Sequence, residues 1–139
     1  MKAAVCRAVG QPLHIEELHL SGPGPGEVRV DLKACAICHS DIFYLDGGWE
    51  HELPAVFGHE AAGIVTQVGD GVSNCTPGDH VVVTLIRSCG DCHYCARGQT
   101  PLCDAQFTLD QNTPITAADG TGIAQGLRTG AFEIGRAHV

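Results

Sequence analysis

The sequence is poor in basic residues, in aromatic residues and in long hydrophobic runs. Eight Lys and Arg residues face 16 Asp and Glu residues, and the net charge of −8 argues against nucleic acid or an anionic membrane as a partner. The longest strongly apolar run, residues 81–86, is far shorter than the roughly 20 residues of a membrane-spanning helix. Arg7 interrupts the N-terminal apolar residues, so no secretion signal is expected. These absences predict a cytoplasmic protein with reduced cysteines.

Cysteine, histidine and glycine, by contrast, are frequent. The 139 residues include eight Cys, eight His and 18 Gly, and 44% of the residues are hydrophobic. This length suits one domain with a buried core. In a reducing compartment cysteines serve as metal ligands or redox groups, so the composition predicts metal or redox chemistry.

The first half of the sequence predicts short β-strands. A half-buried strand over Val28–Cys38 is expected, because apolar residues alternate there with charged ones. Further strands are expected at residues 2–8, 13–19, 60–68 and 80–86. Ser40–Leu45 predicts a short helix with Ser40 or Asp41 as its N-cap. Many short strands joined by Gly- and Pro-containing turns favour a small barrel or sandwich.

The second half is harder to assign. Residues 104–130 are polar and show no clear period, and Gly130–Phe132 starts like a strand before the pattern breaks. Residues 134–139 resemble one reading frame of a common sequencing-library adapter. We therefore interpret residues 133–139 as a non-native tail and expect residues 134–139 to continue no sheet, the alternative being a genuine tail. Residues 1–132 are taken as the domain.

Four cysteines share a compact spacing, C-x2-C-x2-C-x7-C, at Cys89, Cys92, Cys95 and Cys103. Four thiolates suit a tetrahedral zinc that is closed to water. Two disulfides are one alternative, which the absent secretion signal disfavours. An iron–sulfur cluster is another, but bacterial ferredoxins place their fourth cysteine three residues on and follow it with proline, where this chain has Asp104. The spacing predicts a structural zinc lobe over residues 86–104.

A second group of chemically active residues lies nearer the N-terminus. Cys38-His39-Ser40-Asp41 follows the predicted strand, and strand ends and loops often display catalytic groups. Gly58-His59-Glu60 precedes the next predicted strand. Each motif alone is weak evidence, because a single Cys is most often a core residue.

The order of these motifs resembles that of one enzyme family. Cys38–Asp41, Gly58–Gly63, Pro77–Val81 and the four-cysteine lobe together resemble the zinc-containing alcohol dehydrogenases of the medium-chain dehydrogenase/reductase superfamily. The resemblance covers nearly the whole chain. It implies the N-terminal catalytic domain, mainly β with short helices, in a GroES-like, partly open β-barrel. It also implies that a C-terminal Rossmann domain is lacking here.

The resemblance implies a role for each residue of the second group. Cys38 and His59 would be ligands of a catalytic zinc, and Glu60 would lie just behind the metal or act as an exchangeable ligand. Asp41 would hydrogen-bond His59 and fix its ring. Ser40 would receive the alcohol proton.

The resemblance also implies cofactors, a substrate pocket and partners. His39 would face the cofactor pyrophosphate, and Trp49 and Leu85 would line the substrate pocket. The cofactors would be one structural and one catalytic zinc, with NAD or NADP bound by the missing domain. Catalytic zinc favours the alkoxide over the alcohol, and nicotinamide then accepts the hydride. The partner would be a small-molecule alcohol or aldehyde, and the full-length protein would form a homo-oligomer.

Two departures from the family pattern bear on the chemistry. Many relatives end the proton relay with a histidine five positions after the Cys ligand, and this chain has Phe43 there, which carries no proton. A third zinc ligand belongs beyond Phe132. The nearest approach to a dinucleotide fingerprint, residues 120–125, lacks its last glycine, so we interpret it as a loop. We therefore expect this fragment alone to be inactive.

Several interpretations remain open. The leading one is a truncated zinc-dependent alcohol dehydrogenase, which interconverts alcohols and aldehydes or ketones. The glutathione-dependent formaldehyde dehydrogenase branch is its closest rival, because residues 104–130 resemble that branch. A polyol or threonine dehydrogenase follows, and a zinc-free quinone reductase is disfavoured by the cysteine lobe. A non-catalytic zinc-binding module is the alternative of another class, and it would need only one tight zinc site.

Overall fold

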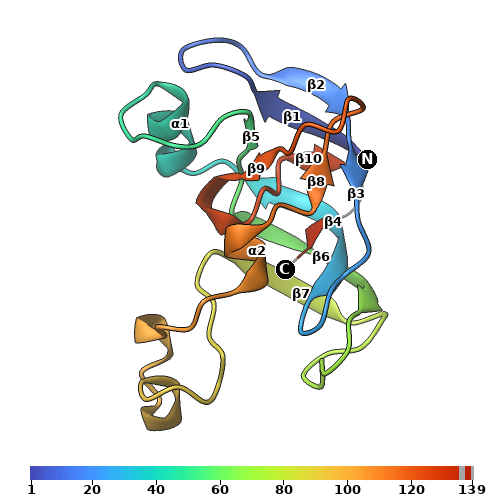
Figure 1. Ribbon diagram of the computed structural model, residues 1–139, viewed down its shortest axis with the longest axis vertical. Helices are drawn as coiled ribbons and strands as arrows, with labels where there is room; N and C mark the ends of the chain where they lie inside the picture. Colours follow the sequence, from blue (N-terminus) through green and yellow to red (C-terminus); the bar gives the residue numbers. More distant parts are fainter. Residues whose placement is uncertain (135–136, 139) are drawn as a thin grey trace.

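Strands make up most of the regular structure in the computed structural model, which describes residues 1–134 and 137–138 (Figure 1). The strands are β1 (Lys2–Cys6), β2 (His14–Glu17), β3 (His19–Leu20), β4 (Val28–Ala36), β5 (Ala55–Val56), β6 (Glu60–Val68), β7 (His80–Thr84), β8 (Ile115–Thr116), β9 (Ala124–Gln125), β10 (Glu133–Ile134) and β11 (Ala137–His138). The helices are α1 (His39–Leu45), α2 (Thr108–Gln111) and the 3₁₀ turns η1 (Cys95–Arg97), η2 (Thr100–Leu102) and η3 (Gly126–Arg128). The prediction of a mainly β fold with short helices is confirmed. None of the helices in the described part is long and apolar enough to cross a bilayer.

The strands form three sheets. In the first, β1 pairs antiparallel with β2, β5 and β10, and β5 runs parallel to β9. The second sheet has the antiparallel order β11-β4-β6-β7, and β3 pairs with β8 in the third. Among the described strands no sheet closes into a barrel.

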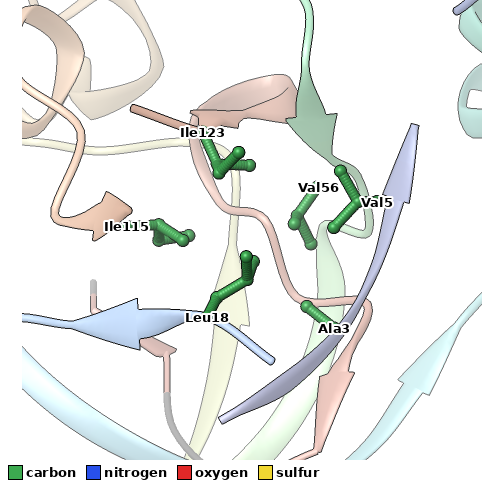
Figure 2. Packing of buried hydrophobic residues seen from close by; sticks show 6 residues of the cluster. All are labelled: Ala3, Val5, Leu18, Val56, Ile115 and Ile123. Carbon is green, nitrogen blue, oxygen red and sulfur yellow. The ribbon is translucent and has the colours of Figure 1, made fainter. Parts of the chain in front are cut away.

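A buried apolar cluster ties the first sheet to the stretch that the sequence left unassigned. Figure 2 shows its members, Ala3, Val5, Leu18, Val56, Ile115 and Ile123. Ile115 and Ile123 come from residues 104–130 and are 2% and 0% exposed. Burying one such side chain contributes about 1.5–3 kcal/mol. Ile115 and Ile123 therefore anchor a polar segment whose strands are too short to show a hydrophobic periodicity.

Strand β4 alternates as predicted only as far as Leu32. Leu32 lies opposite Gly63 and Ala34 opposite Ala62, which leaves Lys33 without a partner residue on β6. One extra residue in a strand reverses which side chains face the core. Cys35, rather than Ala34, therefore packs against the buried cluster of this sheet.

Three further predictions of local structure need correction. The expected strand over residues 13–19 breaks at Leu18, because its side chain enters the core while its N–H donates to the Met1 carbonyl at 2.8 Å. Cys38, not Ser40 or Asp41, is the N-cap of α1. Residues 120–125 are a loop only in part, because they end in the parallel strand β9.

The expectation that residues 134–139 continue no sheet is wrong for Ile134, Ala137 and His138. Glu133–Ile134 pair with β1, and Ala137–His138 pair with β4. Residues 135, 136 and 139 lie outside the described residues. An open sheet edge offers backbone donors and acceptors that any extended segment can use. The pairing is therefore independent of where the tail comes from, and the non-native origin stays a prediction.

Candidate metal centres and active site

The four cysteines of the lobe bring their sulfurs together. All four Sγ atoms lie within 4.8 Å of one another, with 4.0 Å between Cys89 and Cys95 and 3.9 Å between Cys92 and Cys103. A tetrahedron with zinc–sulfur bonds of about 2.3 Å has edges of about 3.8 Å, so this donor set fits one zinc ion. All eight cysteines, each within the described residues, are free. The alternative of two disulfides finds no support.

The backbone of the lobe curves around the point where the four sulfurs meet. Gly90 and Gly98 both have positive φ, which glycine adopts without a side-chain clash. The N–H of Cys92 points at the sulfur of Cys89, at 3.3 Å, and the N–H of Cys95 at that of Cys92, at 3.5 Å. These turns project the lobe from the sheets, at the lower left of Figure 1.

The thiols of the lobe differ in acidity. The hydrogen bond from the N–H of Cys95 is the main cause that lowers the pKa of Cys92 to about 7. A side-chain hydrogen bond with Asp91 raises the pKa of Cys89 to about 12. Neighbouring sulfurs cannot all carry charge in the absence of a cation, since like charges disfavour ionisation.

A second group of donors meets at one end of the β4–β6 pair. Ala36, the last residue of β4, lies opposite Glu60, the first residue of β6. Cys38 follows β4 by two residues and His59 precedes β6 by one, so the antiparallel register brings them together although they are 21 positions apart. Ligand atoms of Cys38, His59 and Glu60 lie within 4.8 Å of one another. A sulfur, an imidazole nitrogen and a carboxylate oxygen are a donor set that suits zinc.

Asp41 holds this group in place from beneath. Its side chain is fully buried, and one carboxylate oxygen accepts hydrogen bonds from the N–H of Gly58 at 3.1 Å and from Nδ1 of His59 at 3.2 Å. The other oxygen accepts from the N–H of Cys38 at 2.9 Å. One carboxylate thus fixes both the backbone of Cys38 and the ring of His59.

The contact with Asp41 also determines which nitrogen of His59 is available. An Nδ1 that donates to a carboxylate leaves Nε2 with its lone pair. This Nε2 lies 3.3 Å from Oγ of Ser40 and 3.9 Å from Oε1 of Glu60. Nε2 of His59, the nitrogen that is available to a metal, therefore faces Ser40 and Glu60.

Gly58 is a positioning residue whose role sequence reasoning missed. Its φ is +91°, and a Cβ there would lie 2.8 Å from the backbone nitrogen of Phe132 and 2.5 Å from its ring. A side chain at this position would therefore displace either Phe132 or the N–H that bonds Asp41. A glycine directly before a candidate ligand was the available signal.

The other predicted site residues are Leu85, Trp49 and His39. Leu85 follows β7, whose last residue Thr84 lies opposite Glu60, so Leu85 sits at the same end of the sheet and is 38% exposed. Trp49 is 51% exposed, and its ring contacts those of Phe43 and Tyr44 on α1. His39 begins α1 and is exposed.

The sequence matches the model of a known domain family. Residues 24–133 match the family model described as the alcohol dehydrogenase GroES-like domain. The chain belongs to this alcohol dehydrogenase family. The predicted GroES-like fold is thereby confirmed, and the order of the motifs was a correct guide to it.

Relatives within the family include alcohol dehydrogenases of two kinds. An NDMA-dependent alcohol dehydrogenase of Amycolatopsis methanolica is 47% identical over 108 residues, which cover 78% of this chain and 29% of that enzyme. An S-(hydroxymethyl)glutathione dehydrogenase of Paracoccus denitrificans is 42% identical over 123 residues, or 88% of this chain and 30% of that enzyme. The chain spans less than a third of the length of both relatives.

Solved structures show the same fold. The crystal structure of an alcohol dehydrogenase zinc-binding domain protein from Burkholderia ambifaria superposes with a TM-score of 0.87 at 35% identity. The match covers 99% of this chain and 39% of that one. The sheets and the lobe therefore follow a known domain from end to end.

Proposed function

We propose that the chain is the N-terminal catalytic part of a zinc-dependent oxidoreductase that interconverts alcohols and aldehydes or ketones with NAD or NADP. The observation that carries this proposal is the second donor group: Cys38, His59 and Glu60 converge above a buried carboxylate, Asp41. A non-catalytic module stabilised by zinc would need only the four-cysteine lobe. A second donor group, which Asp41 holds by hydrogen bonds and which has only three protein donors among the described residues, favours catalysis, because a catalytic zinc keeps one position open.

In this proposal Cys38 and His59 hold the catalytic zinc, with Glu60 beside them. When bound there, zinc supplies Lewis acidity that favours the alkoxide form of an alcohol. Asp41 fixes the ring of His59 so that Nε2 points into the site. The hydroxyl of Ser40, 3.3 Å from that nitrogen, accepts the alcohol proton and passes it on, because a hydroxyl both accepts and donates.

The relay beyond Ser40 departs from the family pattern. Phe43 occupies the position of the usual histidine and carries no proton, so the relay would have to end elsewhere, at cofactor ribose and solvent. His39, exposed at the start of α1, would face the cofactor pyrophosphate, and the exposed side chains of Trp49 and Leu85 would line the substrate pocket.

We propose further that the natural protein continues beyond Phe132 into a Rossmann domain, with residues 133–139 as a non-native replacement. The length of the relatives supports this, since the chain spans 29% and 30% of two of them. The same domain would supply most of a homo-oligomer contact. Eight free thiols support a cytoplasmic location.

A second candidate function is the oxidation of S-(hydroxymethyl)glutathione. The relative with that name, at 42% identity over 88% of this chain, favours it. The ratio of kcat/KM for S-(hydroxymethyl)glutathione to that for a simple primary alcohol distinguishes the two candidates. A ratio far above one identifies the glutathione-dependent branch, and a ratio near or below one excludes it.

Activity of the protein restored beyond Phe132 tests the proposal. We expect alcohol-dependent formation of reduced NAD or NADP, which the 139-residue chain alone should not show. Ser40→Ala should retain zinc and lose rate by about 10²-fold, because proton transfer by a positioned side chain contributes that much. Ser21→Ala, remote from the site in sequence, is the matched control. Turnover by the 139-residue chain, or full activity of Ser40→Ala, would contradict the proposal.

A further inference from the structure

Arg87 lies at the base of the cysteine lobe, two residues before the first of the four cysteines, Cys89. Its side chain is only 10% exposed, although an arginine side chain is normally at the surface. A buried guanidinium is stable only where protein acceptors replace the water that it has lost. The contacts of Arg87 therefore show to which parts of the chain the lobe is fixed.

Three partners from the chain after the lobe surround this guanidinium. Nη1 donates to Oδ1 of Asp110 at 2.6 Å, Nη2 donates to the backbone carbonyl of Arg128, and Cζ lies 5.9 Å from the ring centroid of Phe107. Asp110 belongs to α2, which Figure 1 shows between the lobe and the sheets. Arg87 thus joins the segment that enters the lobe to the segment that leaves it after Cys103.

The carbonyl that Arg87 binds belongs to a strained turn, η3. Leu127 and Arg128 have φ values of +52° and +63°. Residues with a side chain rarely adopt this conformation, and two in succession persist only where neighbouring groups hold them. The hydrogen bond from Arg87 to the carbonyl of Arg128 is one such restraint. The buried Thr129, whose N–H donates to the carbonyl of Gly126 at 3.2 Å, is another.

The chain that follows this turn pairs with the segment that carries His59. The N–H of Ala131 donates to the carbonyl of Gly58 at 2.9 Å, and the N–H of Phe132 donates to the carbonyl of Phe57 at 2.7 Å. His59 is the next residue after Gly58. A displacement of the turn therefore moves the backbone that places the ring of His59.

We propose that Arg87 is a positioning residue that couples the two candidate metal centres. The lobe, closed around its zinc, holds Arg87 against the turn, and the turn fixes the backbone at His59. Metal binding gives the lobe two states, since ligands that converge on an ion repel or separate without it. The proposal goes beyond the proposed function, because it concerns the position of His59 whether or not the protein oxidises alcohols.

Amide hydrogen exchange of the zinc-loaded 139-residue chain tests this coupling without turnover. In Arg87→Gln, exchange of the N–H groups of Ala131 and Phe132 should accelerate by about tenfold or more, the factor expected for the loss of a hydrogen bond to a charged group. The N–H of Val65, which is hydrogen-bonded farther along β6, is the internal reference and should exchange as in the wild type.

Two further variants separate coupling from a general loss of stability. Arg97→Gln removes an exposed arginine of the same lobe, which contacts His93, and should leave the exchange rates unchanged. Cys103→Ser, which empties the lobe, should accelerate the same N–H groups as Arg87→Gln. The double variant should add little to either single variant, because both act through the same contact.

Cobalt(II) binding at the second donor group provides a spectroscopic readout that a role confined to the stability of the lobe would not change. The visible absorption bands of cobalt(II), titrated into the chain with zinc in the lobe, report its affinity for this group. We expect this affinity to be about tenfold lower in Arg87→Gln than in the wild type, the size of effect that groups orienting a ligand have on metal binding. Elemental analysis should still give about one zinc per chain.

The outcomes separate this proposal from the proposed function. Unchanged exchange at Ala131 and Phe132 in Arg87→Gln, or an equal acceleration at Val65, overturns the coupling, and so does an unchanged cobalt affinity. Local acceleration in a chain whose second donor group binds no cobalt supports the coupling and counts against the proposed function. If Arg87→Gln fails to fold, Arg87→Lys gives the same comparison, because an ammonium keeps the charge but lacks the planar fork that reaches both acceptors.

Discussion

At the residue scale, the site depends most on Asp41. Its buried carboxylate accepts from Cys38, Gly58 and His59, so a single side chain joins the two segments that carry the proposed ligands. A buried charge is stable only where hydrogen bonds replace the lost water, and these three donors do so. Asp41 is therefore a structural requirement as well as a partner of His59.

Replacing Asp41 should destabilise the domain strongly. Asp41→Ala leaves three donors without their acceptor, and the free energy of unfolding is expected to fall by about 3 kcal/mol or more. Urea unfolding of the zinc-loaded chain measures this change. Asp46→Ala, at an exposed carboxylate that ends the same helix, should change it by less than about 0.5 kcal/mol. Equal effects of the two substitutions would show that Asp41 does not join the segments.

The role of Asp41 could be predicted from the sequence only through the family resemblance. The motif Cys38–Asp41 is recognisable, but nothing local indicates that the carboxylate turns inward or that Gly58 donates to it. Both facts depend on contacts between segments far apart in the chain. Cys38 as N-cap was missed for a local reason, since cysteine is not a preferred capping residue.

At the element scale, pairing between strands brings the site together. The register of β4 with β6 and of β6 with β7 places Cys38, Glu60 and Leu85 at one end of the second sheet. The strands themselves were predictable, because their apolar residues recur over five or more positions. The two-residue strands β5, β8 and β9 were not, because a period needs more residues than they contain. The bulge at Lys33 could not be predicted either, because the sequence does not show which residue of a strand lacks a partner on the neighbouring strand.

An ion pair between Arg7, which directly follows β1, and Glu16 of β2 gives a pH dependence at this scale. Arg7 donates to both carboxylate oxygens of Glu16, at 2.9 and 2.6 Å, and this hydrogen-bonded contact lowers the pKa of Glu16 below its usual value. A lowered pKa in the folded state stabilises the fold above the unfolded-state pKa. That contribution is lost as the pH falls through the folded-state pKa.

Glu16→Gln should therefore cost stability at neutral pH and nothing in acid. Because the pair is partly exposed, we expect a loss of about 0.2–1 kcal/mol in the free energy of unfolding. The difference between wild type and Glu16→Gln should vanish once the pH lies below the lowered pKa. Glu17→Gln, at the next residue of the strand, serves as the control. Urea unfolding at a series of pH values checks this, and a difference that grows in acid would refute the ion pair.

At the scale of the whole molecule, the chain combines one complete donor set with one that is open. The lobe supplies four sulfurs at tetrahedral spacing, whereas the second group supplies Cys38, His59 and an exposed Glu60. Each lost ligand removes binding energy and leaves the ion more exposed to water. The 139-residue chain should therefore retain about one tightly bound zinc, in the lobe.

The zinc content of the protein restored beyond Phe132 tests the central claim most directly. After dialysis against a weak chelator, elemental analysis should give about two zinc ions per chain in the wild type, as expected for one closed and one open site. Cys103→Ser and Cys38→Ser should each reduce this to about one, by emptying different sites. About one zinc in the wild type, unchanged by Cys38→Ser and lost in Cys103→Ser, would leave only the lobe and contradict the account of a catalytic metal centre.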